Sequence, residues 1–243
     1  QGPIVGALSP QQLGVGVPSG CQKQIWSARM VHDMILNAIA QSQDEELTQR
    51  DDGPKAPIGL ADWVFVKLDQ KNAHNSYKRA RAQTELQKIR GAEGFARVHW
   101  ATNSPAPKLV HFDEGVAQEI CLSIEGGQQG SPLVPPAYGA VLNPILKEFD
   151  SGLGEDGLVR AIQDDVLIMG KRDKVLPRIK DFALALEKIG GQLATGAGKN
   201  SVYCPAGPLE EGTFDDRLQQ TKVVDEEGNE SYGFELCGAA IGQ

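Results

Sequence analysis

Apolar positions along the chain change several times from helical to strand-like spacing, and these changes predict its main elements. From Gln22 to about Gln41 apolar residues recur every three or four positions. This predicts an amphipathic helix that buries Ile25, Trp26, Met30, Met34, Ile35, Ala38 and Ile39. Residues 62–69 are β-branched and aromatic, as expected of a short buried strand. The apolar run 158–169 is interrupted by Asp164 and Asp165, which predicts a hairpin with two carboxylates at its tip.

The remaining segments predict a mixed fold. Residues 1–20 are rich in Gly, Pro and Gln and are expected to be mostly extended or looped, and residues 42–59 read as a connector. Further elements are expected as helices at about 75–90, 137–149 and 173–189, strands at 109–112, 119–124, 192–194 and 201–204, and a hairpin pairing 221–224 with 232–236. Helices and strands in this irregular order predict an α+β domain built on an antiparallel sheet.

Composition is ordinary for a globular protein. The 243 residues are 40% hydrophobic and 23% charged, enough for one substantial core. No apolar run approaches the roughly 18 residues that a membrane span needs, so no membrane partner is expected. The first residues lack both an initiator Met and a signal-peptide pattern, which favours a fragment or a processed product. The four cysteines form no zinc-ligand spacing and suggest no disulfide framework, so we expect a reducing, intracellular compartment, its identity left open.

The net charge of −8 argues against a stand-alone nucleic-acid binder, because phosphate contacts require Lys and Arg. The acidity is concentrated at the C-terminal end. Residues 205–243 carry 2 basic and 9 acidic groups, whereas residues 61–204 carry 18 and 17. The middle of the chain is therefore close to neutral and remains compatible with a nucleic-acid substrate.

Asp164 and Asp165, together with Asp69 at the end of strand 62–69, indicate a metal site. Neighbouring carboxylates in a turn repel each other, and a bound divalent cation would relieve that repulsion. Oxygen ligands of this kind suit Mg²⁺, and two such ions support an in-line phosphoryl displacement. The alternative is a solvated acidic turn, which is common.

Three segments in fixed order carry a family resemblance. FVKLDQKNAHNS (65–76), GGQQGSPLVP (126–135) and IQDDVLIMG (162–170) resemble the palm of reverse transcriptases, in particular those of non-LTR, LINE-type retrotransposons. Residues 11–17 and 234–242 resemble the block before the palm and the primer-grip region. The resemblance implies a partial fingers segment and connector at 1–60, a palm domain with an antiparallel sheet flanked by helices at 61–204, and an acidic connector with a primer-grip-like hairpin at 205–243, the thumb being absent.

The resemblance also implies roles for individual residues. Asp69, Asp164 and Asp165 would be the catalytic carboxylates that hold two Mg²⁺ ions. The nucleotide-binding positions would be His74, Gln129, Gly130 and Lys199. His74 stands where the family usually has Phe or Tyr, which leaves sugar discrimination open, and Lys199 could equally be a solvated lysine.

Residues Asn72, Asn75, Ser76 and Arg79 match a family run that shapes the helix behind the site. Helix capping and surface solvation are the alternative for these four.

The function implied is RNA-directed DNA synthesis, in which a primer 3′-hydroxyl attacks a dNTP. Partners would be an RNA or DNA template with its primer, and the isolated chain is expected to be inactive without fingers and thumb. The alternative is a catalytically silent palm that serves as a structural or assembly module and binds protein partners. His74, Ile162-Gln163 and the acidic C-terminal end favour this second interpretation.

Overall fold

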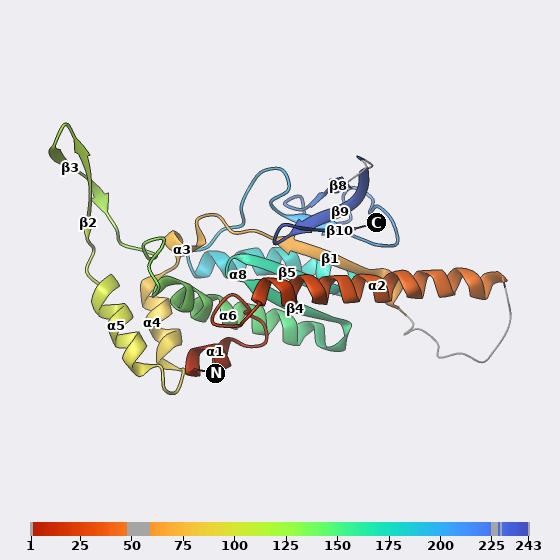
Figure 1. Ribbon diagram of the computed structural model, residues 1–243, viewed down its shortest axis with the longest axis horizontal. Coiled ribbons are helices and arrows are strands. Elements are labelled where there is room, and N and C mark those ends of the chain that lie inside the picture. Colours follow the sequence, from red (N-terminus) through yellow and green to blue (C-terminus); the bar gives the residue numbers. More distant parts are fainter. Residues whose placement is uncertain (1, 48–58, 225–227, 229, 243) are drawn as a thin grey trace.

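The computed structural model describes residues 2–47, 59–224, 228 and 230–242. Its centre is a five-stranded sheet, which Figure 1 shows between helices and a smaller C-terminal sheet. The strand order is β4 (Gly157–Ile162), β5 (Asp165–Lys171), β1 (Trp63–Leu68), β6 (Ser201–Tyr203) and β7 (Gln219–Gln220). All neighbours are antiparallel except β6 and β7. The predicted combination of helices with an antiparallel sheet is therefore confirmed.

Both faces of this sheet are covered by apolar side chains. On one face Val64 and Val66 of β1 pack against α6 (Val134–Leu153) and α8 (Ile179–Lys188). On the other face Phe65 packs against α2 (Gly20–Leu47) and the C-terminal strands β9 (Glu230–Leu236) and β10 (Ala239–Gly242). Successive side chains of a strand point to opposite faces, so burial on both sides explains the nearly continuous apolar sequence of β1.

The helix predicted from Gln22 is present as α2, but its predicted buried face is partly wrong. Trp26 is 71% exposed and Met30 is 60% exposed, and Met34 is exposed as well. The buried apolar positions are Ala28, Val31, Ile35 and Ala38. Both sets of residues have helical spacing, so the sequence alone did not distinguish the packed face from the exposed one.

The N-terminal segment, predicted to be mostly extended or looped, is so at residues 9–19 but also contains the short helix α1 (Pro3–Leu8). Pro3 occupies the first helical position, where a missing N–H group costs no hydrogen bond. The helix predicted at 75–90 is divided into α3 (Ala73–Ser76) and α4 (Arg79–Gln87), with the buried Tyr77 in an extended conformation between them. Helix α5 (Glu93–Asn103) was not predicted.

Other predicted elements agree more closely. The strands predicted at 109–112 and 119–124 are present as β2 (Lys108–Asp113) and β3 (Val116–Leu122), which pair with each other, and β8 (Lys222–Val224) pairs with β9 as predicted. The predicted helix 173–189 is interrupted: α7 (Arg172–Val175) and a 3₁₀ turn (Leu176–Arg178) precede α8. Residues 192–194 form no strand and contribute only a bridge between Leu193 and Gln70. Short 3₁₀ helices cover Leu60–Asp62 and Gly154–Asp156.

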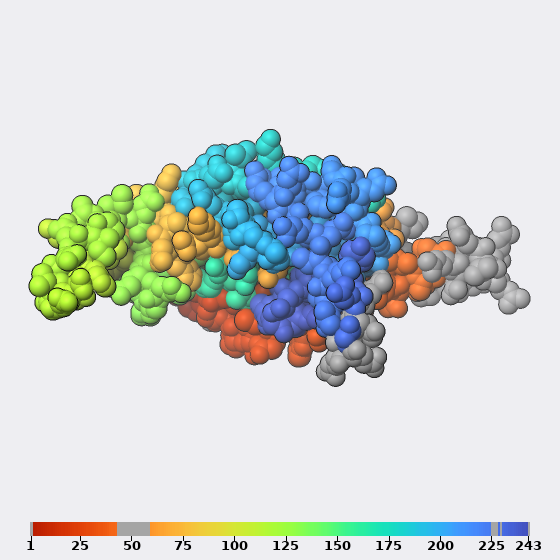
Figure 2. Space-filling model, turned by 90° about the horizontal axis from the view of Figure 1, so that it is seen from above, coloured from red at the N-terminus to blue at the C-terminus, as the bar shows by residue number. Residues whose placement is uncertain are grey.

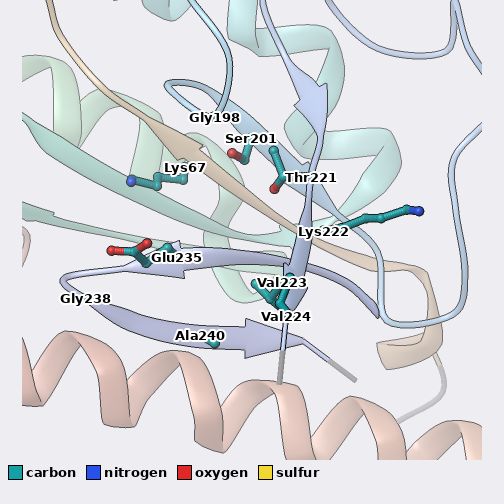
Figure 3. A pocket seen from close by; sticks show the side chains of 10 residues that line it. All are labelled: Lys67, Gly198, Ser201, Thr221, Lys222, Val223, Val224, Glu235, Gly238 and Ala240. Atoms are coloured by element: carbon teal, nitrogen blue, oxygen red, sulfur yellow. The ribbon is translucent and has the colours of Figure 1, made fainter. Parts of the chain in front are cut away.

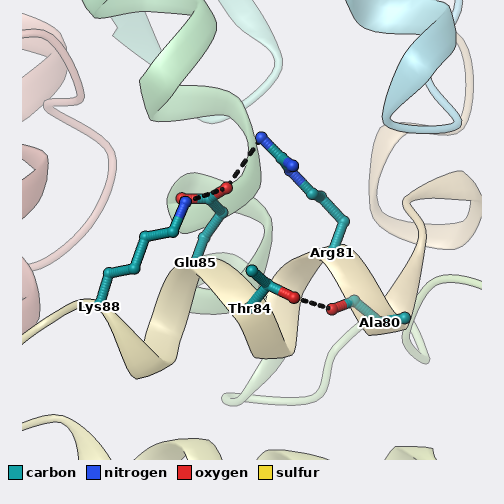
Figure 4. A network of polar contacts seen from close by, with 5 residues as sticks. All are labelled: Ala80, Arg81, Thr84, Glu85 and Lys88. Atoms are coloured by element: carbon teal, nitrogen blue, oxygen red, sulfur yellow. Dashed lines mark hydrogen bonds and ion pairs between the residues drawn. The ribbon is translucent and has the colours of Figure 1, made fainter.

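A polar network stabilises α4 at the surface of this core. The buried Glu85 accepts from Arg81 Nη2 at 2.9 Å and from Lys88 Nζ at 2.8 Å, as Figure 4 shows. Thr84 Oγ1 donates to the Ala80 carbonyl at 3.0 Å. Partners three and four residues apart lie on one helix face, so Glu85 is buried without leaving its charge uncompensated.

The β2–β3 hairpin projects from the body of the molecule next to α5 (Figures 1 and 2). All its residues are exposed, including Phe112 and Ile120. None of the helices in the described part of the chain is both long and apolar enough to cross a bilayer.

Candidate active site

The backbone of the central sheet brings the three aspartates to one edge. Strand β1 ends at Leu68, which pairs with Val166 of β5, so the next residue, Asp69, lies beside Asp165. Ile162 and Asp165 close the β4–β5 hairpin, which leaves Gln163 and Asp164 as its two-residue turn. The antiparallel pairing of β1 with β5 thus brings Asp69 close to Asp164 and Asp165, although they are far apart in the sequence.

The turn depends on an unusual backbone at Gln163 and on a partner from the N-terminal segment. Gln163 has φ = +57°, a left-handed conformation that disfavours most side chains. Gln12 Oε1 accepts from Gln163 N at 2.8 Å, and Gln12 Nε2 donates to Gln163 O at 3.2 Å. Gln163 Nε2 donates to Gly14 O at 2.9 Å, and a Cβ on Gly14 would lie 2.7 Å from Gln163 N. Residues 12–14 therefore hold the aspartate turn in place.

Asp164 is held from the opposite side by Gln70, the residue after Asp69. Gln70 Nε2 donates to the Asp164 carbonyl at 3.1 Å, and the hydroxyl of buried Tyr138 donates to Gln70 Oε1. Burial, and secondly the charge of Asp164, raise the pKa of Tyr138 well above its usual value. Tyr138 therefore remains a protonated donor, and the Tyr138–Gln70 pair fixes the Asp164 backbone.

The loop at 192–200 fixes Asp69. Asn200 Oδ1 accepts from Asp69 N at 3.0 Å, and the Asp69 carbonyl accepts from Ala194 N at 2.9 Å. Asn200 Nδ2 closes this arrangement by donating to the Ala194 carbonyl at 2.7 Å. Lys199 Nζ lies 2.8 Å from Asp69 Oδ2, and this hydrogen bond and charge raise the pKa of Lys199. The structure thus pairs Lys199, whose side chain is exposed to solvent, with the first aspartate.

The electrostatics of the cluster agree with its geometry. Burial raises the pKa of Asp165, and the charges of Asp164 and Asp69 raise it further. Lys67 and Lys199 act in the opposite direction. Three acids and two bases therefore share one half-buried region, in which the ionised form of Asp165 is disfavoured.

Lys67 connects this region to a cavity of about 500 Å³. Figure 3 shows Lys67 above Glu235 of β9 at the left of the view, and Ser201 and Thr221 to their right. The cavity lies between β1 and the C-terminal strands, so polar and charged side chains from distant parts of the chain face one open space beside the aspartates.

The other predicted nucleotide-binding residues occupy two different places. His74 Nε2 lies 3.3 Å from Gln163 Oε1, and its ring packs edge-on against Tyr138 with centroids 5.4 Å apart. His74 is therefore part of the support of the aspartate turn. Gln129 instead lines a cavity of about 650 Å³ next to Arg79 and the base of the β2–β3 hairpin. Gly130, with φ = +90°, faces open space in the same loop.

Arg79 anchors that loop and is neither a helix cap nor a solvated side chain. It is buried, and its guanidinium makes five hydrogen bonds, to the carbonyls of Asn103, Ser123, Glu125 and Gly126 and to Ser123 Oγ. All five guanidinium donors are used, which a planar fork allows and a lysine ammonium does not. The interpretation as a solvated surface residue is wrong for Arg79.

Several residues that build the site were not singled out from the sequence. Gln12, Gly14, Gln70, Tyr138 and Asn200 make its supporting hydrogen bonds and close contacts. Each acts through a partner far away in the chain, and glutamines or asparagines in loops carry no spacing signal. Two signs were available: Gln12 and Gly14 lie in the block 11–17 that carries part of the resemblance, and a glycine between apolar residues often marks a close backbone approach.

The donor set at the three aspartates consists of carboxylate oxygens. Among the residues that the structure describes, no group of three or more His, Cys, Asp or Glu side chains is arranged to hold a metal ion. The Asp69 carboxylate faces Lys199, which accounts for its present orientation.

Comparison with known proteins bears on the fold. No family model and no curated protein matches the sequence. Apo telomerase from Candida tropicalis superposes with a TM-score of 0.51 at 12% identity, over 88% of this chain and 36% of that one. At 12% identity the likeness shows the fold alone: this chain shares its fold with the part of that telomerase on which it superposes.

Two further telomerase structures are similar. A form of the Candida tropicalis enzyme truncated from the C-terminal domain gives a TM-score of 0.48 at 13% identity, over 88% of this chain and 40% of that one. Telomerase from Candida albicans in complex with a TWJ fragment of telomeric RNA gives 0.43 at 11% identity, over 89% and 33%. The chain thus spans about two fifths or less of the telomerase chains it resembles.

Proposed function

We propose that this chain is the palm of a template-directed nucleotidyltransferase, an RNA-directed DNA polymerase of the non-LTR retrotransposon kind. The observation that carries the proposal is the β1–β5 register, which sets Asp69 beside the Asp164–Asp165 turn in a reverse transcriptase-related fold. Fold similarity by itself does not define a reaction, so the proposal depends on these side chains.

The carboxylate chemistry of the three aspartates suits magnesium, although their present arrangement, with Asp69 paired to Lys199, is not that of a metal site. Carboxylate oxygens are the ligands Mg²⁺ prefers, and the raised pKa of Asp165 reflects repulsion from Asp164 and Asp69 as well as burial. Asp69, Asp164 and Asp165 would hold the ions, which when bound supply charge neutralisation and activation of a primer hydroxyl. When the cations bind, Lys199 would leave the Asp69 carboxylate and pair with an anionic phosphate of the substrate instead.

The remaining residues of the site position these groups. Gln70 and Gln12 fix the backbone of the aspartate turn, and Asn200 fixes that of Asp69. Preorganised ligands need no rearrangement during the reaction, which is how a polymerase active site mainly accelerates phosphoryl transfer. The substrates proposed are a primed RNA or DNA template and a dNTP.

A second function is favoured by the ion pair between Lys199 and Asp69 at 2.8 Å. This contact compensates one carboxylate without any metal, as a structural module would require. In that case the palm would serve as an assembly subunit that binds protein partners and catalyses nothing.

Magnesium binding separates the two functions. The unfolding free energy of the 243-residue chain is measured with and without Mg²⁺, for the wild type, Asp164→Asn, and the exposed control Asp216→Asn. The catalytic palm predicts stabilisation of about 1.4 kcal/mol at a tenfold excess over the Kd, present in the control and lost in Asp164→Asn. Equal responses of all three proteins would favour the silent module.

Primer extension then tests the reaction itself. The chain is assayed with a primed RNA template, dNTPs and Mg²⁺, alone and with reverse transcriptase fingers and thumb supplied by fusion. We expect extension only in the fusion, and a loss of at least 100-fold in Asp164→Asn. Extension that survives in both Asp164→Asn and Asp165→Asn would exclude this mechanism.

A further inference from the structure

Two cysteines from opposite ends of the chain lie side by side near the aspartate cluster. Cys21 is in the first turn of α2, and Cys237 begins the turn between β9 and β10. Cys237 Sγ donates to Gln24 Oε1 at 3.6 Å, and Gln24 lies one helical turn beyond Cys21. Burial first, and then the neighbouring Cys21 side chain, raise the pKa of the Cys237 thiol. The contact with Gln24, one helical turn from Cys21, therefore places the second thiol close to the first.

The surrounding core preorganises this pair. Phe234 and Ile241 on the C-terminal hairpin are buried with Ala28 and Ile35 of α2. Gln24, fully buried, also donates to the Arg160 carbonyl at 3.5 Å. The hairpin is therefore seated on the helix by an apolar layer, as Figure 1 shows for β10 and α2, and the thiols meet at the end of that layer.

The backbone at Cys237 is unusual for a cysteine. Its φ is +50°, followed by Gly238 at +78°, the left-handed pair typical of a tight hairpin turn. Asn, Asp and Gly are the residues that favour such a position, because other side chains are strained there. A strained residue whose side chain meets a second thiol suggests a chemical role.

We propose that Cys21 and Cys237 are a redox-active thiol pair that a small disulfide such as oxidised glutathione converts into an intramolecular disulfide. The bond would join α2 to the β9–β10 turn. The Cys21 thiolate attacks one glutathione sulfur and expels a glutathione thiolate. The Cys237 thiol then loses its proton, attacks the Cys21 sulfur and expels the second glutathione. Two protein thiols are oxidised, and one glutathione disulfide is reduced to two thiols.

The environment assigns the order of the two steps. Cys21 is exposed, whereas Cys237 is half-buried. Burial, with the neighbouring Cys21 as the next cause, raises the pKa of Cys237 to about 11. The thiolate is the attacking species, so the accessible Cys21 reacts first with the oxidant and Cys237 closes the bond.

The remaining cysteines provide controls within the chain. Cys121 is exposed on β3 of the projecting hairpin, whereas Cys204 is buried in the main core. An exposed thiol without a neighbour is expected to stop at a mixed disulfide. The reaction of Cys121 with glutathione therefore measures the effect of exposure alone, and disulfide formation by Cys21 and Cys237 is compared with it.

The experiment treats the reduced 243-residue chain with oxidised glutathione at low protein concentration, then alkylates free thiols and maps the peptides by mass spectrometry. We expect an intramolecular link between the peptides of Cys21 and Cys237, reversed by a dithiol. In the oxidised protein the thermal midpoint should rise by roughly 5–10 °C, because the bond closes a long loop.

Three variants complete the test. Cys21→Ser should abolish the link, whereas Cys121→Ser should leave it unchanged. Cys237→Asn, which suits the left-handed backbone, should abolish the link and retain one glutathione on Cys21. Separate glutathione adducts on Cys21 and Cys237 of the wild type, or a link that disappears on dilution, would overturn the proposal. The readout is covalent, so it does not depend on polymerase activity.

Discussion

Gln12 and Gln163 are joined by a pair of hydrogen bonds in which the Gln12 amide satisfies both backbone groups of Gln163, at 2.8 Å and 3.2 Å. The partners come from the N-terminal segment and from the tip of the aspartate hairpin. A side-chain amide thus replaces the strand neighbour that a two-residue turn lacks, and it stabilises a left-handed residue directly before Asp164.

Removing the Gln12 amide should destabilise this turn. Gln12 is buried, so Gln12→Ala leaves two backbone groups of Gln163 without partners and should reduce the unfolding free energy by about 1–3 kcal/mol. Urea unfolding measures the change. The exposed Gln22→Ala is the matched control and should stay within about 0.5 kcal/mol of the wild type. Equal effects of the two variants would show that the amide pair contributes no stability.

The glycines before α6 differ in what a Cβ would meet. A Cβ on Gly126 (φ +61°) would lie 2.1 Å from the backbone of Asn75, whereas Gly130 (φ +90°) has open space. Gly126→Ala should therefore destabilise by about 3 kcal/mol or more, and Gly130→Ala by only about 1 kcal/mol for its backbone conformation. Thermal unfolding of the two variants gives the comparison, and similar midpoints would contradict the close approach.

Arg79 should be irreplaceable by lysine. Arg79→Lys keeps the charge but leaves several of four carbonyls without a donor, so we expect a loss of about 2–4 kcal/mol. Amide hydrogen exchange should quicken at residues 123–127 and in the β2–β3 hairpin. Arg97→Lys on the exposed face of α5 serves as the control. Unchanged exchange in Arg79→Lys would show that the guanidinium does not anchor the loop.

Buried histidines should make the chain acid-sensitive. Burial lowers the pKa of His32 and of His99 below the ordinary 6.5. The unfolded chain therefore binds protons that the folded chain excludes, and stability present above pH 6.5 is lost as the pH falls from 6.5 toward the lowered values. The slope should approach about 1.4 kcal/mol per pH unit for each histidine.

A substitution assigns this slope to one histidine. His32→Gln, which can still hydrogen-bond to the Tyr203 hydroxyl, should flatten the dependence, whereas the exposed His111→Gln should leave it unchanged. Urea midpoints between pH 7 and pH 5 provide the measurement. A slope that is the same in His32→Gln and in the wild type would contradict the role of His32.

The sequence alone indicated those local elements whose apolar pattern is compatible with only one kind of secondary structure. Strand β1 is buried on both faces, and the Asp164–Asp165 turn interrupts an otherwise continuous apolar hairpin. For these elements period and turn chemistry are local properties. The order of the motifs also indicated which three aspartates would lie at one edge of the sheet.

Only the tertiary structure decided which face of α2 is buried, where Arg79 points and what supports the aspartate turn. Trp26 and Ile35 lie in the same helical pattern, yet only Ile35 meets β9 and β10. Gln12 and Gln163 are 151 residues apart in the chain, and Gln24 and Cys237 are 213 residues apart. Such contacts depend on how the layers pack, and a local pattern of polar and apolar residues contains no information about a distant partner.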